Sequence, residues 1–380
     1  METATVHIHD GLGPRIGTLA RVTSVNRSWA ILQPGQASVR VPIIDDEGRI
    51  DPMVRDNVDP YLGRAIVIES DHYPFPWVGA ITNAQDEPDT RSVALSAVSL
   101  DAIMIHRFLA ADAAYDNDAG QVFKLIMQDM NLANESGIGI AGTPVQGRNY
   151  SGSFPDRAVY AALRALCEQT GNEFGMVYDV SPAGVQADAY FVADVGLDRF
   201  ADVTLTDGGN CERVQSGVDG RGMTYTLHMV AGQTSAIEAY TDRSRVTRQR
   251  TAGQQPRDGA ITGASASVHG YEVRRSETGG APLTRAERLV IAENLRSEGA
   301  VNQASELLMG KAQPPERPLR LRVFEDDELW AKLDIGSVVR FVSEEAFHGN
   351  GYDGPVRIVS VHPFEEGGDM ELVCQVLEGK

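Results

Sequence analysis

The sequence predicts an α+β protein, mostly β, in which two related small β-barrel domains flank an α+β middle region. Two observations support this class. A pattern of three β-rich runs occurs near each end of the chain, at residues 63–98 and 336–376, and the clearest helical patterns lie between them. β-branched residues favour strands, while Gly, Pro and Asp clusters mark the connections between them.

The two copies follow the same plan. The first reads GRAIVIES, PWVGAITN, an acidic turn (residues 86–89) and SVALSAV, and the second reads GSVVRFVS, GPVRIVSV, an acidic turn (365–369) and MELVCQV. The second copy carries an insertion in its first loop, at residues 346–353, and slips by one residue in the acidic turn. Any two three-stranded antiparallel meanders share this outline, so both a duplication and a coincidence stay open.

The order and spacing of these segments resemble the central hub protein of long-tailed phage tails and related contractile injection machines. The residues that carry the resemblance lie in the first hundred and the last sixty positions: 77–81, 92–100, His106-Arg107, 333–339 and 354–358. The resemblance implies two related barrels per chain with an α+β module between them. It also implies a homotrimer whose six similar barrels let a three-fold hub dock on a six-fold tail tube.

The chain of 380 residues should form more than one domain, because single cores rarely grow beyond ~250–300 residues. We expect four parts. They are an N-terminal β-barrel (1–100), a helical connection and loop (101–152), an α+β middle domain (153–312) and a C-terminal β-barrel (313–380). The middle domain should contain a long hydrophilic insertion at 232–281 and a helix at 285–311.

The N-terminal part reads as short strands over residues 5–32, followed by another at 38–43. In the first strand His7 and His9 alternate with Val6 and Ile8, so the histidines are expected to face solvent opposite buried aliphatic residues. Together with Asp10 they could also serve as metal ligands, but two ligands on one strand without a third elsewhere are a weak signal.

The helical patterns follow the first copy. Ser99 or Asp101 can cap the apolar segment 102–112, and further helices are expected at 120–132 and 158–170, the latter ending at Gly171. The loop at 133–152 would suit a partner contact or a domain junction. Strands are expected at 173–180, 186–192, 202–205 and 223–230.

The insertion carries four arginines in an otherwise acidic chain: Arg243, Arg245, Arg248 and Arg250. They could contact an acidic partner subunit or lie on a solvated loop or β-ribbon. Thr284 is the expected cap of the helix at 285–311, which Pro314-Pro315 would end.

The formal net charge of −19 argues against a protein that binds nucleic acid through its phosphates. Acidity favours solubility, and it would also let DNA pass through a channel without adhering. No apolar run approaches the length of a membrane helix, and the N-terminus METATVHIHD lacks the features of a signal peptide. We therefore expect no membrane span and synthesis in the host cytoplasm.

The sequence predicts no catalytic site, no cofactor site and no metal site, because each candidate motif lacks a part that its chemistry requires. GIGIAG (Gly137, Gly139, Gly142) matches a dinucleotide fingerprint but lacks the strand before it and the helix after it. The run 116–120 resembles a calcium loop without the closing Glu, and Glu344-Glu345 is one acid pair among 53 acidic residues. The three cysteines, Cys167, Cys211 and Cys374, are too few and too widely spaced for a disulfide framework, and we expect Cys167 and Cys374 to be buried.

The functional prediction is a structural virion protein at the tail tip: a homotrimeric baseplate hub that joins the tail tube, or a distal tail protein, to a tip, spike or fibre protein. The residues expected at the interface lie in or beside the two acidic turns: Asp86, Glu87, Asp89, Arg91, Glu365, Glu366 and Asp369. Two alternatives stay open. One is a ring-forming distal tail protein, and the other is a β-rich carbohydrate-binding or glycoside-hydrolysing protein.

Overall fold

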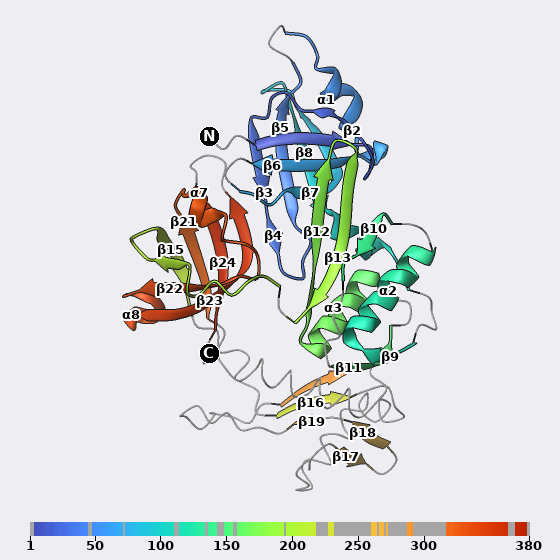
Figure 1. The fold of residues 1–380 in the computed structure, drawn as a ribbon, viewed down its shortest axis with the longest axis vertical. Coiled ribbons are helices and arrows are strands. Elements are labelled where there is room, and N and C mark those ends of the chain that lie inside the picture. Colours follow the sequence, from blue (N-terminus) through green and yellow to red (C-terminus); the bar gives the residue numbers. More distant parts are fainter. Residues whose placement is uncertain are drawn as a thin grey trace.

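The computed structural model describes most of the two ends of the chain and part of its middle. The described residues are 4–44, 48–70, 73–109, 114–133, 136–142, 148–154, 158–193, 195–217, 227–231, 260–263, 266–269, 271–272, 287–291, 317–363 and 369–377. Figure 1 shows two curled sheets, one from each end of the chain, with a helical layer and a long hairpin beside them. The expected class, mostly β with an α+β middle region, is confirmed.

The N-terminal sheet has seven strands in the order β2-β1-β6-β7-β8-β5-β3, all paired antiparallel. Its period-2 pattern builds the core: β5 buries Ala37, Val39 and Val41 and exposes the residues between them. The strands are β1 (Ala4–His9), β2 (Arg15–Thr18), β3 (Ser24–Arg27), β5 (Gln36–Pro42), β6 (Ala65–Ser70), β7 (Trp77–Glu87) and β8 (Ser92–Ser99). Two short helical elements, α1 (Pro52–Asn57) and η1 (Pro60–Leu62), connect β5 to β6.

The C-terminal sheet has the order β14-β22-β23-β24-β21-β15, with β4 (Trp29–Ala30) attached to β23. Its strands are β14 (Thr204–Thr206), β15 (Cys211–Ser216), β21 (Pro318–Val323), β22 (Val338–Ser343), β23 (Tyr352–Pro363) and β24 (Met370–Val376). The short helix α7 (Asp327–Trp330) joins β21 to β22, and α8 (Ala346–Gly349) joins β22 to β23.

Five strands of each sheet share one topology. In chain order they are β3, β5, β6, β7, β8 in the first sheet and β15, β21, β22, β23, β24 in the second. In both sets the last three strands form an antiparallel meander, the fifth strand pairs with the second, and the second pairs with the first. A short helical element lies between the second and third strands of each set.

The register agrees as well as the order. The fourth strand carries a β-bulge in both sheets, between Ile81 and Asn83 in β7 and between Ile358 and Ser360 in β23. Counting from the bulges, Val39 corresponds to Leu321 across the equivalent pairs, and both are buried. The glycines that open the two stretches, Gly63 and Gly336, both have positive φ, +65° and +81°. The similarity between residues 63–98 and 336–376 is therefore one of topology and register, beyond sequence pattern.

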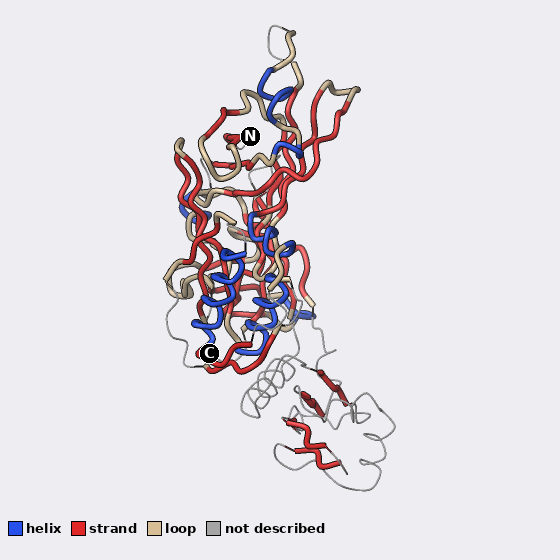
Figure 2. The backbone as a smooth tube through the Cα atoms, turned by 90° about the vertical axis from the view of Figure 1, so that its right-hand side faces the viewer, coloured by secondary structure: helices blue, strands red, loops and turns tan. Residues whose placement is uncertain are grey.

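The middle region packs two helices and a small sheet into a separate core. Helix α2 (Ala119–Ala133) and helix α3 (Val159–Thr170) contact the three-stranded sheet of β10 (Ile138–Ile140), β13 (Gly184–Val192) and β12 (Glu173–Ser181). Phe123 of α2 stacks on Phe191 of β13 with ring centroids 5.1 Å apart. Helix α3 ends as expected at Gly171, whose φ of +66° places it in the left-handed region. Both helices lie on the right-hand side of the molecule in Figure 1, which is the side that faces the viewer in Figure 2.

Several expected elements differ from the structure. The segment after Ser99 forms a single 3-10 helix, η2 (Leu100–His106), because Arg107 and Phe108 are extended and pair with the start of α3. The Val159 amide donates to the Arg107 carbonyl at 2.7 Å. The loop at 133–152 contains β10 and also β11 (Asn149–Ser153), which pairs with β9 (Ala114–Asp118). In both places backbone pairing with distant residues decides the local conformation.

The domain boundaries expected from the sequence also differ from the way in which the strands group into sheets. Strands β14 and β15, expected in the middle domain, belong to the C-terminal sheet because their apolar residues Leu205 and Cys211 enter its core. Of the expected helix at 285–311, residues Glu287–Ile291 form strand β20 instead, in a parallel ladder with β16 (Leu227–Ala231). The β-branched pair Val290-Ile291 suits that ladder.

The remaining parts of those expectations lie outside the described residues. They are the rest of 285–311 and most of the insertion at 232–281, including its four arginines. Within the insertion the described segments are three short strands: β17 (Ala260–Gly263), β18 (Ala266–His269) and β19 (Tyr271–Glu272).

The expectation that His7 and His9 face solvent is wrong. Their exposed fractions are 6% and 0%. The His7 ring nitrogens lie 2.8 Å from the Thr18 hydroxyl and 3.0 Å from a Glu69 carboxylate oxygen, and burial together with Arg15 lowers the pKa of His7. Both faces of β1 are covered, because the outer face of this sheet packs against a hairpin from the middle region.

Candidate functional site: the junction of the two sheets

The first feature of the junction is strand β4, which leaves the N-terminal segment and joins the C-terminal sheet. Trp29 pairs with Val361 and Ala30 with Ser360, and the amide of Ile31 donates to the carbonyl of Val359 at 3.1 Å. β23 already pairs with β24 at these residues, so β4 takes the opposite side, beyond the end of β22. Backbone hydrogen bonds thus tie the first sheet's chain to the second sheet.

Aromatic packing strengthens this tie. Tyr73, from the connection between β6 and β7, is 2% exposed and lies in the core of the C-terminal sheet. Its hydroxyl donates to the carbonyl of Leu333 at 3.2 Å, and its ring lies 5.1 Å from Trp29 and 5.2 Å from Phe75. Such ring pairs add stability beyond the area they bury.

The second feature is an ion pair between the middle region and the C-terminal sheet. The Arg357 guanidinium of β23 binds the Glu173 carboxylate of β12 through two nitrogens, one of them at 2.7 Å. Arg357 also donates to the carbonyls of Gly336 (3.1 Å) and Val195 (3.0 Å), and the amide of Val195 donates to Glu173 at 2.8 Å. Both side chains are at most 15% exposed. The hydrogen bonds above stabilise the two charges in this half-buried position.

The third feature is a close crossing of two backbone segments beside that ion pair. Gly196 and Gly336 have φ of +92° and +81° and lie against each other. A Cβ atom on Gly336 would lie 2.0 Å from the Val195 carbonyl oxygen, and one on Gly196 would lie 2.2 Å from the Gly336 carbonyl carbon. Only glycine allows both the conformation and the contact.

The fourth feature is the β12–β13 hairpin, which covers the outer face of the N-terminal sheet. Val185 and Ala187 pack with Val67, Val78 and Leu100 in a small apolar cluster. Its tip is held by backbone bonds from Arg15 to Pro182 (3.0 Å) and from Val185 to Leu12 (2.9 Å). The hairpin therefore contacts both sheets, one along its face and the other at Glu173.

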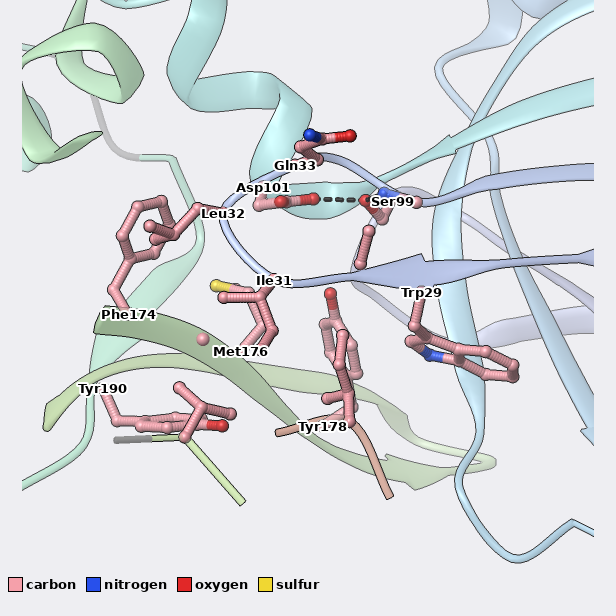
Figure 3. A pocket seen from close by; sticks show the side chains of 15 residues that line it. Trp29, Ile31, Leu32, Gln33, Ser99, Asp101, Phe174, Met176, Tyr178 and Tyr190 are labelled. Carbon is pink, nitrogen blue, oxygen red and sulfur yellow. Dashed lines mark hydrogen bonds between the residues drawn. The ribbon is translucent and has the colours of Figure 1, made fainter. Parts of the chain in front are cut away.

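A pocket of about 90 Å³ lies where these features meet. Figure 3 shows Ile31 and Leu32 on one side of it and Met176, Tyr178 and Tyr190 of the hairpin on the other, with Asp101 and Ser99 at one end. The Ser99 hydroxyl donates to the Asp101 carboxylate and accepts from the Gly35 amide at 2.7 Å. The lining is mostly apolar, which makes this a packing gap at the junction more than a ligand cleft.

Electrostatics in the pocket follow from burial. Desolvation raises the pKa of the Asp101 carboxyl, against the opposing effect of the Ser99 hydrogen bond and of the backbone amides of Asp101 and Ala102. Desolvation also raises the pKa of Tyr178, and it raises that of Tyr190 to about 12. These tyrosines stay neutral over the physiological range.

Asp101 gives a prediction about pH. A carboxyl whose pKa is higher in the folded state binds more protons when folded, so its contribution to stability is present at low pH and is lost as pH rises from its ordinary value, about 4, through the folded pKa. We expect Asp101→Asn to remove this component from the pH dependence of urea unfolding. Asp202→Asn, at an exposed position outside the proposed interfaces, is the control and should leave the profile unchanged. Superimposable profiles for wild type and Asp101→Asn would contradict the prediction.

The described members of the predicted interface set lie at or near the turn between the fourth and fifth strands: Asp86 and Glu87 end β7, Asp89 and Arg91 lie in the turn after it, and Asp369 precedes β24. Glu87 is engaged within its own sheet: Arg40 binds its carboxylate at 2.7 and 3.0 Å, and this hydrogen bonding lowers the pKa of Glu87. Asp86 and Asp89 are exposed, and Arg91 has a positive φ of +51° in the turn. Asp369 lies 4.0 Å from Arg322, while Glu365 and Glu366 lie outside the described residues.

The junction residues were not predicted as functional from the sequence. Trp29, Glu173, Gly196 and Arg357 come from segments far apart in the chain. The sequence holds two weak signals: Gly336 opens the second copy, and Arg357 interrupts the apolar run GPVRIVSV. Neither signal identifies a partner residue.

The motifs weighed for chemistry have structural roles. Within GIGIAG, residues 138–140 form β10, and Gly139 makes room for the Asp188 carboxylate. Asp118 accepts from the Gly120 amide at 2.9 Å and so starts α2. Glu344 and Glu345 are exposed, and the described residues contain no group of three or more His, Cys, Asp or Glu that could hold a metal ion. All three cysteines are buried thiols outside any disulfide, and burial is what was expected for Cys167 and Cys374.

Comparison with known proteins gives matches in structure and none in sequence. No family model matches the chain, and neither does any curated protein. Among solved structures, a tail protein from Neisseria meningitidis MC58 aligns with a TM-score of 0.60 at 11% identity, covering 99% of this chain and 97% of that one. The 43 kDa tail protein of prophage MuSo2 from Shewanella oneidensis aligns at 0.57 and 13%, covering 98% of each chain.

A third match is the prophage tail protein gp18 from Listeria monocytogenes EGD-e, with a TM-score of 0.55, 10% identity and coverage of 99% and 95%. These likenesses span nearly the whole chain, so the protein has the fold of phage tail proteins. The resemblance inferred from sequence is confirmed at the level of fold. None of the helices in the described ranges is long and apolar enough to cross a membrane.

Proposed function

We propose that the protein is a homotrimeric hub at the tip of a phage tail or phage-like particle. It would join a tail tube or distal tail protein to a tip, spike or fibre protein, as a structural component of the virion with no catalytic activity. The coarser part of this proposal, a tail-associated structural role, agrees with the tail proteins that share the fold.

The observation that supports the trimer is the pair of sheets with one topology in one chain. A closed ring requires each interface patch to find its partner under the same rotation. Three chains with two equivalent sheets each would present six similar surfaces, related by about sixty degrees, to a six-fold tube. A distal tail protein with one barrel per chain would need six chains for the same surface.

The junction suits this role because it joins the two sheets through several kinds of contact. Strand β4, Tyr73 and the Glu173–Arg357 pair connect segments of both sheets and the hairpin. A hub that transmits force between a tube and a tip benefits from such a rigid connection. We propose the acidic turns, including Asp86 and Asp89 as well as Glu365 and Glu366, as ring or tube contacts, and an acidic lumen along which DNA passes without adhering.

The test is the assembly state of the purified full chain. We expect native mass spectrometry to give three times the mass of the chain, and averaged electron-microscope images to show a ring with three-fold symmetry and six similar lobes. A ring of six chains would favour the distal tail protein instead. A monomer at every concentration tested would overturn the proposal.

A further inference from the structure

Strand β23 is long enough to pair with three strands, β22, β24 and β4. Residues 352–357 of β23 pair with β22 on one side, and residues 356–363 pair with β24 on the other. Past Ile358 the first side no longer contacts β22, and β4 fills it through Ser360 and Val361. The C-terminal sheet therefore has no unpaired backbone at this point.

Strand β7 is its equivalent in the first sheet, and within the described part of the chain it pairs with two strands, β6 and β8. Residues 77–80 pair with β6, and residues 79–87 pair with β8. Among the described residues no strand pairs with Asn83–Glu87 on the β6 side. Alignment of the two bulges places Thr82 at the position of Val359, Asn83 at Ser360 and Ala84 at Val361.

This free edge is open to solvent. Thr82, Asn83, Gln85 and Asp86 are exposed, and Ala84 is half-buried. Its first four residues, 82–85, carry no proline and no charged side chain, and such residues usually protect a strand edge from pairing. An unprotected edge of this kind is a template for an added strand.

We propose that the Thr82–Glu87 edge of β7 accepts a strand from the C-terminal sheet of a second copy of this chain, in the way that β23 accepts β4. The proposal rests on the proposed homotrimer. Within one chain, strand β4, from the N-terminal segment that builds the first sheet, joins the second sheet. In a ring where the two sheets alternate, the next contact of the same kind runs from the second sheet of one copy to the first sheet of its neighbour.

The backbone geometry says which groups the added strand would use. The amide of Ile31 bonds to the carbonyl of Val359, and along a strand successive residues direct these groups to opposite sides, so Val359 and Val361 face β4. The equivalent groups are the Thr82 carbonyl and the Ala84 amide and carbonyl. The hydrogen bonds of β5 and β8 agree. The Thr23 amide donates to the Arg40 carbonyl, so Arg40 directs its backbone groups toward β3 and the adjacent residue, Val39, directs its groups toward β8. Leu95, opposite Val39, therefore faces β5, and Ala84, opposite Leu95, directs its amide away from β8.

The test is Ala84→Pro in the full chain, with Ala84→Ser as the matched control. Proline removes one amide and adds bulk on the free side, while an edge strand tolerates it in the monomer. We expect Ala84→Pro to keep the circular dichroism spectrum of wild type and to weaken assembly by about tenfold or more per interface in analytical ultracentrifugation. Ala84→Ser keeps the amide and should assemble as wild type does.

Hydrogen exchange gives a second readout that does not depend on a variant. We expect the Ala84 amide to exchange at least about tenfold more slowly in the assembled protein than in the dissociated chain, since a bonded amide exchanges only on local opening. A folded Ala84→Pro that assembles like wild type, or an Ala84 amide unprotected in the trimer, would overturn the edge proposal and leave the trimer standing. A wild-type chain that never assembles would overturn both.

Discussion

Gly336→Ala is expected to lower the free energy of unfolding by roughly 3 kcal/mol or more. A left-handed conformation costs a residue with a Cβ about 1–2 kcal/mol, and overpacking against fixed atoms adds about 1–3. At Gly336 the obstacle is the Val195 carbonyl, 2.0 Å from the added atom, and it is backbone that cannot rotate away. The crossing would have to open, and with it the contact between the middle region and the C-terminal sheet.

The shared topology of the two sheets supplies the control for this experiment. Gly63 is the topological equivalent of Gly336 and has a similar φ of +65°, but a Cβ there would meet nothing within 4 Å. Gly63→Ala should therefore cost only the conformational part, about 1–2 kcal/mol. Urea unfolding followed by circular dichroism measures both. Equal losses for the two variants would show that the crossing contributes nothing beyond backbone conformation.

Arg357→Met is expected to cost about 3 kcal/mol, because it leaves the half-buried Glu173 carboxylate without its partner. It also removes the donors to two carbonyls, those of Val195 and Gly336. Replacing both partners in Arg357→Met/Glu173→Met should restore much of the loss, because no unpaired charge then remains at the junction. Guanidinium or urea unfolding of the two single variants and the double variant forms the cycle that measures the coupling.

An exposed pair on the same sheet is the matched control. Arg340 binds Asp353 through two bonds of 2.7 Å, similar to the Arg357 pair, but the two side chains are 43% and 53% exposed. Arg340→Met should change stability little, because water screens the pair and solvates whichever partner is left. If Arg340→Met and Arg357→Met cost the same, burial is not what makes the Glu173–Arg357 pair important.

The sequence predicted best the elements whose periodicity is set by one local core. The alternation of Ala37, Val39 and Val41 and the stripe of α3 that stops at Gly171 appear as expected. Where a second layer covers an element, the prediction was wrong. His7 and His9 read as solvent-facing because the residues that help cover that face, Val185 and Ala187, lie some 180 positions away in the sequence.

The similarity of the two β-rich stretches lies between these cases. Sequence alone showed two meanders of similar outline, and it could not distinguish common topology from coincidence. Strand order and the matching bulges in β7 and β23 made the comparison specific, because pairing partners and register are properties of the folded sheet.

By itself, then, the sequence determined the class of the fold, the position of the two β-rich ends and the main helices, because burial periodicity and turn residues act over a few positions. Only the tertiary structure decided which segments form the junction. Trp29, Glu173, Gly196 and Arg357 gain their roles from partners in other parts of the chain, and nothing in their local sequence specifies those partners. The free edge of β7 likewise became visible only once the strand on its equivalent, β23, had been located.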